Sequence, residues 1–236
     1  MKSRSEFIEN LVYASVWPMI AVFLLWLVFW VEVRLGFNFT EFGIYPRSFS
    51  GLRGILFGPF IHGSVKHLYN NTFPVFFLML MLMHFYRPVA LKVLFLGVAI
   101  SGFFTWLFGR EAYHIGASGL IYVLASFIFF KGILSKNYRL VALSLVTVFL
   151  YGSLLWYVLP IEEKISWEGH ASGFIAGLFL SFLFKKDMPG PVRYVWESED
   201  YKVESDPFMK HFDEKGNFIP SSEMPSNNDE RDNNPE

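Results

Sequence analysis

Six long runs of this sequence contain no Asp, Glu, Lys or Arg, and they limit what the chain can fold into more than any other feature. A helix that crosses a membrane needs about 20 mainly apolar residues, with about 17–25 tolerated. The last of the six runs is short, and we expect Ser166 and Trp167 to extend it. The sequence therefore predicts an all-α membrane protein, a bundle of six transmembrane helices. The runs are Leu11–Val31, Leu68–Tyr86, Val93–Gly109, Ala112–Phe130, Leu140–Ile161 and Gly169–Phe184.

The overall composition agrees with this interpretation. Hydrophobic residues make up 53% of the chain and charged residues 17%, whereas soluble domains carry about 25% charged residues. The formal net charge of −1 argues against a nucleic-acid-binding protein. The chain has no cysteine, which excludes disulfides, thiolate metal sites and a cysteine nucleophile.

The charges divide the chain into two parts. Residues 1–184 contain 13 Lys or Arg and 8 Asp or Glu, whereas residues 185–236 contain 7 and 13. The second part is also rich in Asn, Ser and Pro, and this composition cannot bury enough apolar surface to fold. We therefore expect a membrane domain over 1–184 and an acidic, largely disordered cytosolic tail over 185–236.

The loops between the uncharged runs predict the orientation. Lys and Arg dominate the connections between runs two and three, between runs four and five, and immediately after run six. The opposite connections carry both signs of charge. Because cytoplasmic loops are enriched in Lys and Arg, both termini should lie in the cytoplasm. The long connection 32–66 then lies outside, and we expect part of it to be embedded in the outer leaflet.

Four of the polar residues inside or at the start of the predicted spans stand out: His67, Asn71, Ser118 and His170. Polar groups in hydrocarbon are costly, so those that persist there are functional candidates. Ser118 precedes the cytoplasmic Lys131 by 13 residues and His170 precedes Lys185 by 15, which is about 20 and 22 Å of helix. The topology thus predicts that the two lie at matching depth, about 10 Å below the outer face.

Each local pattern also has a purely structural interpretation that involves no chemistry. Gly116 and Gly119 flank Ser118, and Gly173 and Gly177 follow His170; small residues of this kind are also typical of close helix packing. A histidine can bond to a backbone carbonyl, and His67 with Asn71 can cap a helix start. His62 and His114 are expected to be interfacial rather than chemical. We set aside His84, at the cytoplasmic end of a span, and His211, in the tail.

A serine nucleophile needs a base for its proton and donors for the developing negative charge. A full triad would add a carboxylate that orients the histidine. All six Asp residues lie in the tail, and no Glu lies within the uncharged runs. Any Ser–His chemistry in this chain is therefore expected to be that of a dyad.

Three separated motifs together resemble the rhomboid family of intramembrane serine proteases, in its bacterial type with a six-helix core. They are HxxxN at 67–71, GASG at 116–119 and HxxGxxxG at 170–177. The resemblance covers about residues 10–184. Gly169 stands where an alanine is usual in the family, and Leu52 with Arg53 stand where many members carry Trp-Arg.

The resemblance implies a role for each matched position. Ser118 is matched to the nucleophile and His170 to the general base. His67, Asn71 and the backbone N–H of Ser118 are matched to the oxyanion site, with Gly116 as a backbone contributor beside it. Tyr122 is matched to the aromatic residue that stacks on the catalytic histidine, with Gly119, Gly173 and Gly177 in support.

The implied function is that of a serine endopeptidase that cleaves peptide bonds in or near transmembrane segments of membrane proteins. Its partners would be such substrates and the lipid bilayer, with no nucleic acid and no metal or organic cofactor. The implied location is the bacterial inner (plasma) membrane. Two alternatives remain open: an inactive rhomboid-like scaffold that binds membrane proteins without cutting them, and a small channel or transporter.

Overall fold

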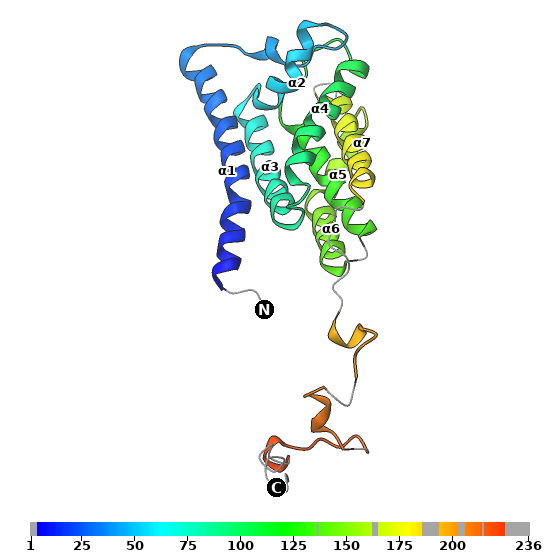
Figure 1. Cartoon of the computed structure of the whole chain (residues 1–236). Helices are drawn as coiled ribbons and strands as arrows, with labels where there is room; N and C mark the ends of the chain where they lie inside the picture. The colour runs from blue at the N-terminus through cyan, green and yellow to red at the C-terminus, as the bar shows by residue number, and fades with distance from the viewer. Residues whose placement is uncertain are drawn as a thin grey trace, which may run out of the picture. The chain divides into compact units, whose positions relative to one another are not determined.

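The computed structural model describes residues 4–135, 137–161, 165–185, 194–202, 206–213 and 215–224. Regular structure within these ranges is helical (Figure 1), so the all-α prediction is confirmed. The α-helices are α1 (Arg4–Leu35), α2 (Gly54–Phe57), α3 (Val65–Phe85), α4 (Ala90–Phe108), α5 (Ser118–Leu134), α6 (Tyr138–Tyr151) and α7 (Trp167–Leu183). Short 3-10 helices are η1 (Thr40–Phe42), η2 (Ser50–Arg53), η3 (Gly58–Phe60) and η4 (Gly152–Val158) in the first 191 residues, and η5 (Val195–Glu197), η7 (Met209–His211) and η8 (Ser221–Glu223) after them.

Three of the described helices, α1, α3 and α4, are long and apolar enough to cross a membrane, and α5 and α6 are shorter apolar helices. Several long apolar helices in one chain agree with a multi-pass membrane protein. The count of six spans and the orientation with cytoplasmic termini stay predictions.

Two helix boundaries differ from the uncharged runs. The run Ala112–Phe130 predicted one continuous helix, but α5 begins only at Ser118, because Gly116 has a φ of +104° that no helix accommodates. The run Leu140–Ile161 is also divided, since α6 ends at Tyr151 and continues as the 3-10 helix η4. By contrast, α7 begins at Trp167 with Ser166 as its N-cap, as the predicted extension of the sixth run requires.

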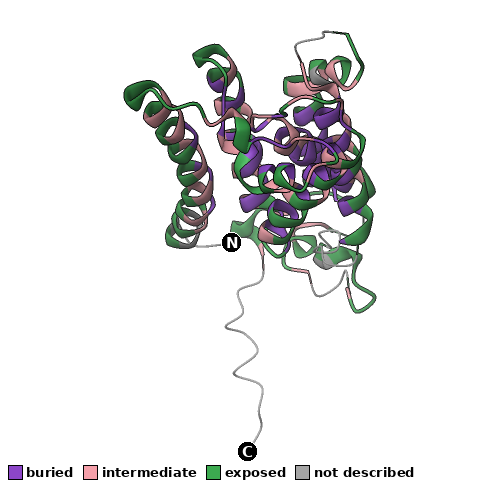
Figure 2. Ribbon diagram, turned by 90° about the horizontal axis from the view of Figure 1, so that it is seen from above, coloured by how far each residue is buried: buried purple, intermediate pink, exposed green. Residues whose placement is uncertain are grey.

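The buried core centres on α5. Leu124, Phe127 and Ile128 are fully buried on this helix, which packs against α3, α4, α6 and α7. Helix α1 lies at the edge beside α3, and most of its surface is exposed (Figures 1 and 2). Exposed apolar side chains on an edge helix are what a lipid-facing helix requires.

Helices α5 and α7 form the closest pair in the bundle. At their far ends the buried Lys131 of α5 donates a hydrogen bond from Nζ to the carbonyl oxygen of Phe184, the C-cap of α7. A cation at a helix C-terminus is favoured by the helix dipole. This contact fixes the end of the pair that lies opposite Ser118 and His170.

The connection between α1 and α3 is tied to the start of α5. Ile44 and His114 exchange two backbone hydrogen bonds of 3.0 and 2.8 Å, and Gly116 N donates to Gly58 O at 2.9 Å. Arg47 adds a bond from its guanidinium to the Gly109 carbonyl at 2.8 Å. The short helices of this connection therefore hold the segment that leads into Ser118.

The chain divides into two compact units, residues 1–191 and 192–236. In the second unit the described residues form 3-10 turns and a small antiparallel bridge between Phe212 and Phe218. Asp213 closes that turn by accepting hydrogen bonds from the backbone of Lys215 and Asn217. The disorder expected for most of the tail stays a prediction.

Candidate active site

Ser118 is the first residue of α5, and the structure leaves the start of that helix open. Its N-cap is Ala117, which has no side-chain oxygen, and no side chain of the described residues caps the helix. The first N–H groups of a helix have no partner within it. The N–H of Ser118 therefore has no partner within α5 and can donate to a group bound at the start of the helix.

His67 and Asn71 converge on Gly116, two residues before Ser118. A Cβ placed on Gly116 would lie 2.7 Å from His67 Nε2 and 3.4 Å from Asn71 Nδ2. Both side chains come from the first two turns of α3, whose N-cap Ser64 accepts a hydrogen bond from the His67 N–H at 3.1 Å. Glycine is required at 116 both for its positive φ and for this close approach.

Asn71, rather than its neighbour Asn70, faces the site. Asn71 is 5% exposed, whereas the Asn70 side chain is exposed. The Asn71 Nδ2 group lies 3.0 Å from His62 Nε2. Nδ2 carries two hydrogens, so one can donate to His62 while the other remains available on the Gly116 side.

His62 has a larger part in the site than the interfacial one expected from the sequence. Its Nδ1 lies 3.2 Å from the Phe60 carbonyl, which can only accept, so Nδ1 carries the hydrogen and Nε2 accepts. Nε2 receives hydrogens from Asn71 and, at 3.5 Å, from the Ala117 N–H. Burial lowers the pKa of His62 to about 4, with the neighbouring His67 adding to the effect. Its pattern HxxxxHxxxN, one turn before α3, is the signal that could have revealed it.

His170 is oriented by a backbone carbonyl. Its Nδ1 lies 2.9 Å from the carbonyl oxygen of Tyr157 in η4. Since that oxygen can only accept, Nδ1 carries the hydrogen and Nε2 of the neutral ring keeps its lone pair. The ring stacks on Tyr122 with a centroid distance of 4.3 Å and an interplanar angle of 16°.

The stack brings His170 to the turn of α5 that carries Ser118, because Tyr122 lies four residues after Ser118 on the same helix face. Glycines permit this approach. A Cβ on Gly173 would lie 2.3 Å from the Gly119 carbonyl, and one on Gly177 would lie 2.0 Å from Ser126 Oγ. The two glycines after His170 therefore form the seam between α7 and α5.

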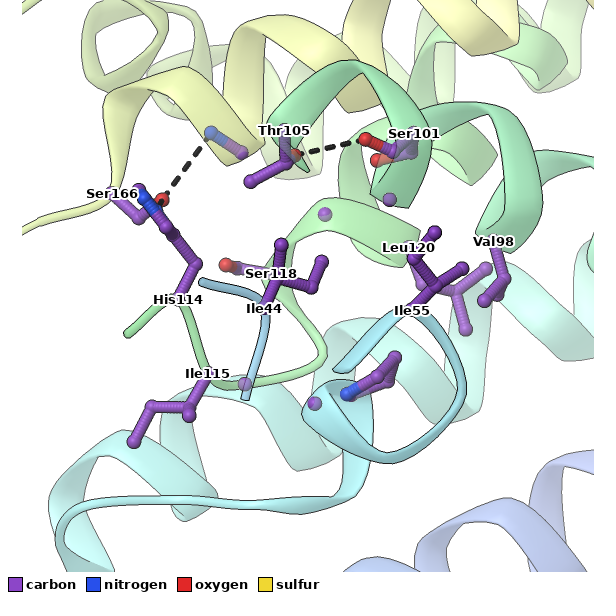
Figure 3. Close-up of a pocket in the computed structure, with 16 residues that line it drawn as sticks. Ile44, Ile55, Val98, Ser101, Thr105, His114, Ile115, Ser118, Leu120 and Ser166 are labelled. Atoms are coloured by element: carbon purple, nitrogen blue, oxygen red, sulfur yellow. Dashed lines mark hydrogen bonds between the residues drawn. The ribbon is translucent and has the colours of Figure 1, made fainter. Parts of the chain in front are cut away.

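A small cavity of about 50 Å³ lies beside Ser118 (Figure 3). Its polar lining comes from Ser101, Thr105, His114, Ser118 and Ser166. The space exceeds the roughly 10–15 Å³ of probe-occupied volume that one water molecule needs. Among the described residues no hydrogen bond joins Ser118 to His170, and such bonds often form only when substrate is bound.

One carboxylate lies closer to the site than the sequence suggested. Because α7 begins at Trp167, Glu168 falls in its first turn, where it is 6% exposed. Its Oε1 lies 3.6 Å from Nε of Arg110, and its Oε2 has no hydrogen-bond partner among the described residues. His170 bonds to the Tyr157 carbonyl instead, so Glu168 does not take the place of a triad carboxylate.

The structure thus brings the sequence-predicted residues together from three helices and the loop that carries Gly116. His67 and Asn71 meet Gly116, and Tyr122 meets His170. Sequence reasoning missed the contribution of His62 and the carbonyl of Tyr157. The described residues contain no group of three His, Cys, Asp or Glu that could hold a metal ion.

Comparison with known families matches residues 50–187 to the rhomboid domain. The chain belongs to the rhomboid family. This family includes serine intramembrane proteases, and the resemblance drawn from the three motifs is confirmed.

Relatives occur in mycobacteria. Proteins of Mycobacterium tuberculosis (strain ATCC 25618 / H37Rv) and Mycobacterium bovis (strain ATCC BAA-935 / AF2122/97) are each 34% identical to this rhomboid over 174 residues. The match covers 69% of this chain and 71% of each relative. A protein of Mycobacterium leprae (strain TN) is 29% identical over 175 residues, 68% of this chain and 67% of that protein. All three are described as uncharacterized proteins.

Proposed function

We propose that this rhomboid is an intramembrane serine endopeptidase that cleaves peptide bonds in or near the transmembrane segments of membrane proteins. The observation that carries the proposal is the stack of His170 on Tyr122, one helical turn from Ser118, with Nδ1 bound to the Tyr157 carbonyl. That arrangement leaves an unprotonated Nε2 as the base for a hydroxyl at the open end of α5.

The first half of the reaction forms an acyl-enzyme. The Ser118 hydroxyl gives its proton to His170 Nε2 while Oγ attacks the scissile carbonyl carbon. The oxygen of the tetrahedral intermediate accepts hydrogen bonds from the Ser118 N–H, the second hydrogen of Asn71 Nδ2 and His67. His170 then gives the proton to the departing amine, and the peptide C–N bond breaks.

In the second half, water hydrolyses the acyl-enzyme. The polar cavity beside Ser118 has room for a water molecule. His170 removes a proton from the water as its oxygen attacks the ester carbonyl, and Ser118 recovers the proton when the acyl group leaves. The Tyr157 carbonyl keeps the His170 ring in one orientation through both halves, and it takes the orienting part that a carboxylate has in a triad.

Substrate choice follows from the position of Ser118 inside the membrane. A transmembrane helix hides its carbonyl groups in i→i−4 hydrogen bonds, so it must unwind before attack. Substrates should carry Gly, Pro or polar residues near the outer end of their helix, which lower the cost of unwinding.

The test is cleavage of a labelled single-span substrate by the purified protein in liposomes, followed on a gel. Ser118→Ala and His170→Ala should each abolish cleavage, and the double variant should be no worse than either single one because the two residues act as a unit. Ser15→Ala and His211→Ala are controls, since Ser15 Oγ bonds to the Leu11 carbonyl in α1 and His211 lies in the tail.

The same assay separates the alternatives. A scaffold would bind the substrate without cutting it, and a channel would pass solutes across the liposome without cutting any substrate. Appreciable cleavage by Ser118→Ala would refute the assignment of the nucleophile.

A further inference from the structure

We propose that the hydrogen bond between His114 and Ser166 is a clamp that sets the separation of Ser118 and His170. His114 lies four residues before Ser118, and Ser166 lies four residues before His170. His114 Nδ1 and Ser166 Oγ are 2.6 Å apart. The inference rests on the proposed function and assigns His114 and Ser166 a positioning role in it.

The polarity of this bond follows from the neighbouring contacts. His114 Nε2 lies 3.1 Å from the Arg110 carbonyl, which can only accept, so Nε2 carries the ring hydrogen. Nδ1 therefore accepts the hydrogen of the Ser166 hydroxyl. Ser166 Oγ in turn accepts the Gly169 N–H at 3.3 Å as the N-cap of α7.

Both ends of the clamp are anchored. His114 is 6% exposed, and its backbone is paired in both directions with Ile44. On the side of Ser166, the Arg110 guanidinium donates to the Ile165 carbonyl at 2.8 Å and its Nε lies 3.6 Å from Glu168. The segment before α5 is therefore joined to Ile165, Ser166 and Glu168 by three polar contacts.

The clamp and the two seam glycines lie on opposite sides of the dyad along the chain. Gly173 and Gly177 hold α7 against α5 on the C-terminal side of His170, because both follow it. Before the dyad in the chain, the bond between His114 and Ser166 joins the two segments, and Figure 3 shows these two side chains next to each other. Since a misplacement of about 1 Å can cost on the order of 100-fold in rate, an anchor on both sides of the dyad matters for proton transfer.

The test removes the clamp and keeps the dyad. His114→Phe keeps a ring of similar size without nitrogen atoms. Ser166→Gly removes the hydroxyl but retains a residue that is tolerated as an N-cap, and Ser166→Thr retains both the hydroxyl and the cap. Each variant is assayed for kcat and KM on the transmembrane substrate, and for the rate at which a small fluorophosphonate labels Ser118.

The clamp predicts that His114→Phe and Ser166→Gly each lower kcat and the labelling rate by about 10- to 100-fold, with KM changed less than about twofold. The double variant should lose little more than the worse single variant, since both remove one interaction. Ser166→Thr should restore kcat to within about threefold of the native value. Substitution of a residue that is needed only for folding would instead lower the amount of folded protein and leave kcat per labelled site unchanged.

The proposal is wrong if the native protein cleaves substrate and one of the variants His114→Phe and Ser166→Gly matches it in both labelling rate and kcat. It is also wrong if the losses of the two single variants add fully in the double variant. If His114→Phe does not fold, Ser166→Gly and Ser166→Thr decide by themselves. Failure of the proposed function looks different, because the native protein would then neither cleave substrate nor be labelled at Ser118.

Discussion

Asn71 and Asn70 are adjacent in the sequence, and replacing each in turn tests the oxyanion site most directly. Asn71 is buried, and its Nδ2 group lies between His62 and Gly116, whereas Asn70 is exposed. Loss of one oxyanion donor commonly costs 10²–10³-fold in kcat, or about 2.7–4 kcal/mol. We therefore expect Asn71→Ala to lower kcat by about that factor with little change in KM. Asn70→Ala should lower it by less than about tenfold, the effect of a single hydrogen bond.

Asn71→Ala should also lower stability, because His62 Nε2 then keeps only the longer contact from the Ala117 N–H at 3.5 Å. An under-satisfied buried acceptor costs about 1–3 kcal/mol. The assay measures kcat and KM for both variants on one fluorescent transmembrane substrate in the same detergent, with a thermal melt of each variant. A kcat loss for Asn70→Ala that equals or exceeds that for Asn71→Ala would refute the reasoning.

Three further predictions test the surroundings of the site. Gly116→Ala should lower kcat by at least about tenfold, because the added Cβ would meet the His67 ring at 2.7 Å. Gly36→Ala is the control for backbone strain, since Gly36 has a φ of +70° and no heavy atom lies within 4 Å of the added Cβ. Equal losses of kcat in the two variants would contradict the prediction. The pKa of His62 is about 4 in the fold and 6.5 ordinarily, so the unfolded chain binds a proton first as the pH falls. The free energy of unfolding should therefore decrease by about 3 kcal/mol between pH values above 6.5 and pH 4. His62→Gln should flatten that part of the unfolding free energy measured against pH, and an unchanged slope would count against the assignment. Lys131→Met should lower the free energy of unfolding by about 1–3 kcal/mol, since the Phe184 carbonyl loses its charged donor; a melting temperature equal to that of the native protein would show that this contact contributes nothing.

The sequence determined where most of the helices lie and which residues make up the proposed site. The hydropathy of about 20 consecutive residues and the presence of a capping side chain such as Ser64 are local properties of a segment. Both can therefore be recognised in the sequence without knowledge of the fold. The HxxxN, GASG and HxxGxxxG motifs likewise supplied every member of the proposed dyad and oxyanion site. Their spacing and the membrane topology also predicted that Ser118 and His170 share a depth.

The tertiary structure decided how those residues are oriented. Helix geometry allows either Asn70 or Asn71 to join His67, and only the packing of α3 against the two loops that carry His62 and Gly116 buries Asn71. The Tyr157 carbonyl, which fixes the tautomer of His170, belongs to η4, a break in an apolar run whose local sequence predicts continuous helix. The bond from His114 to Ser166 joins residues 52 apart in the chain. Contacts of this kind depend on where separate helices end and how closely glycines let them approach, which no local pattern contains.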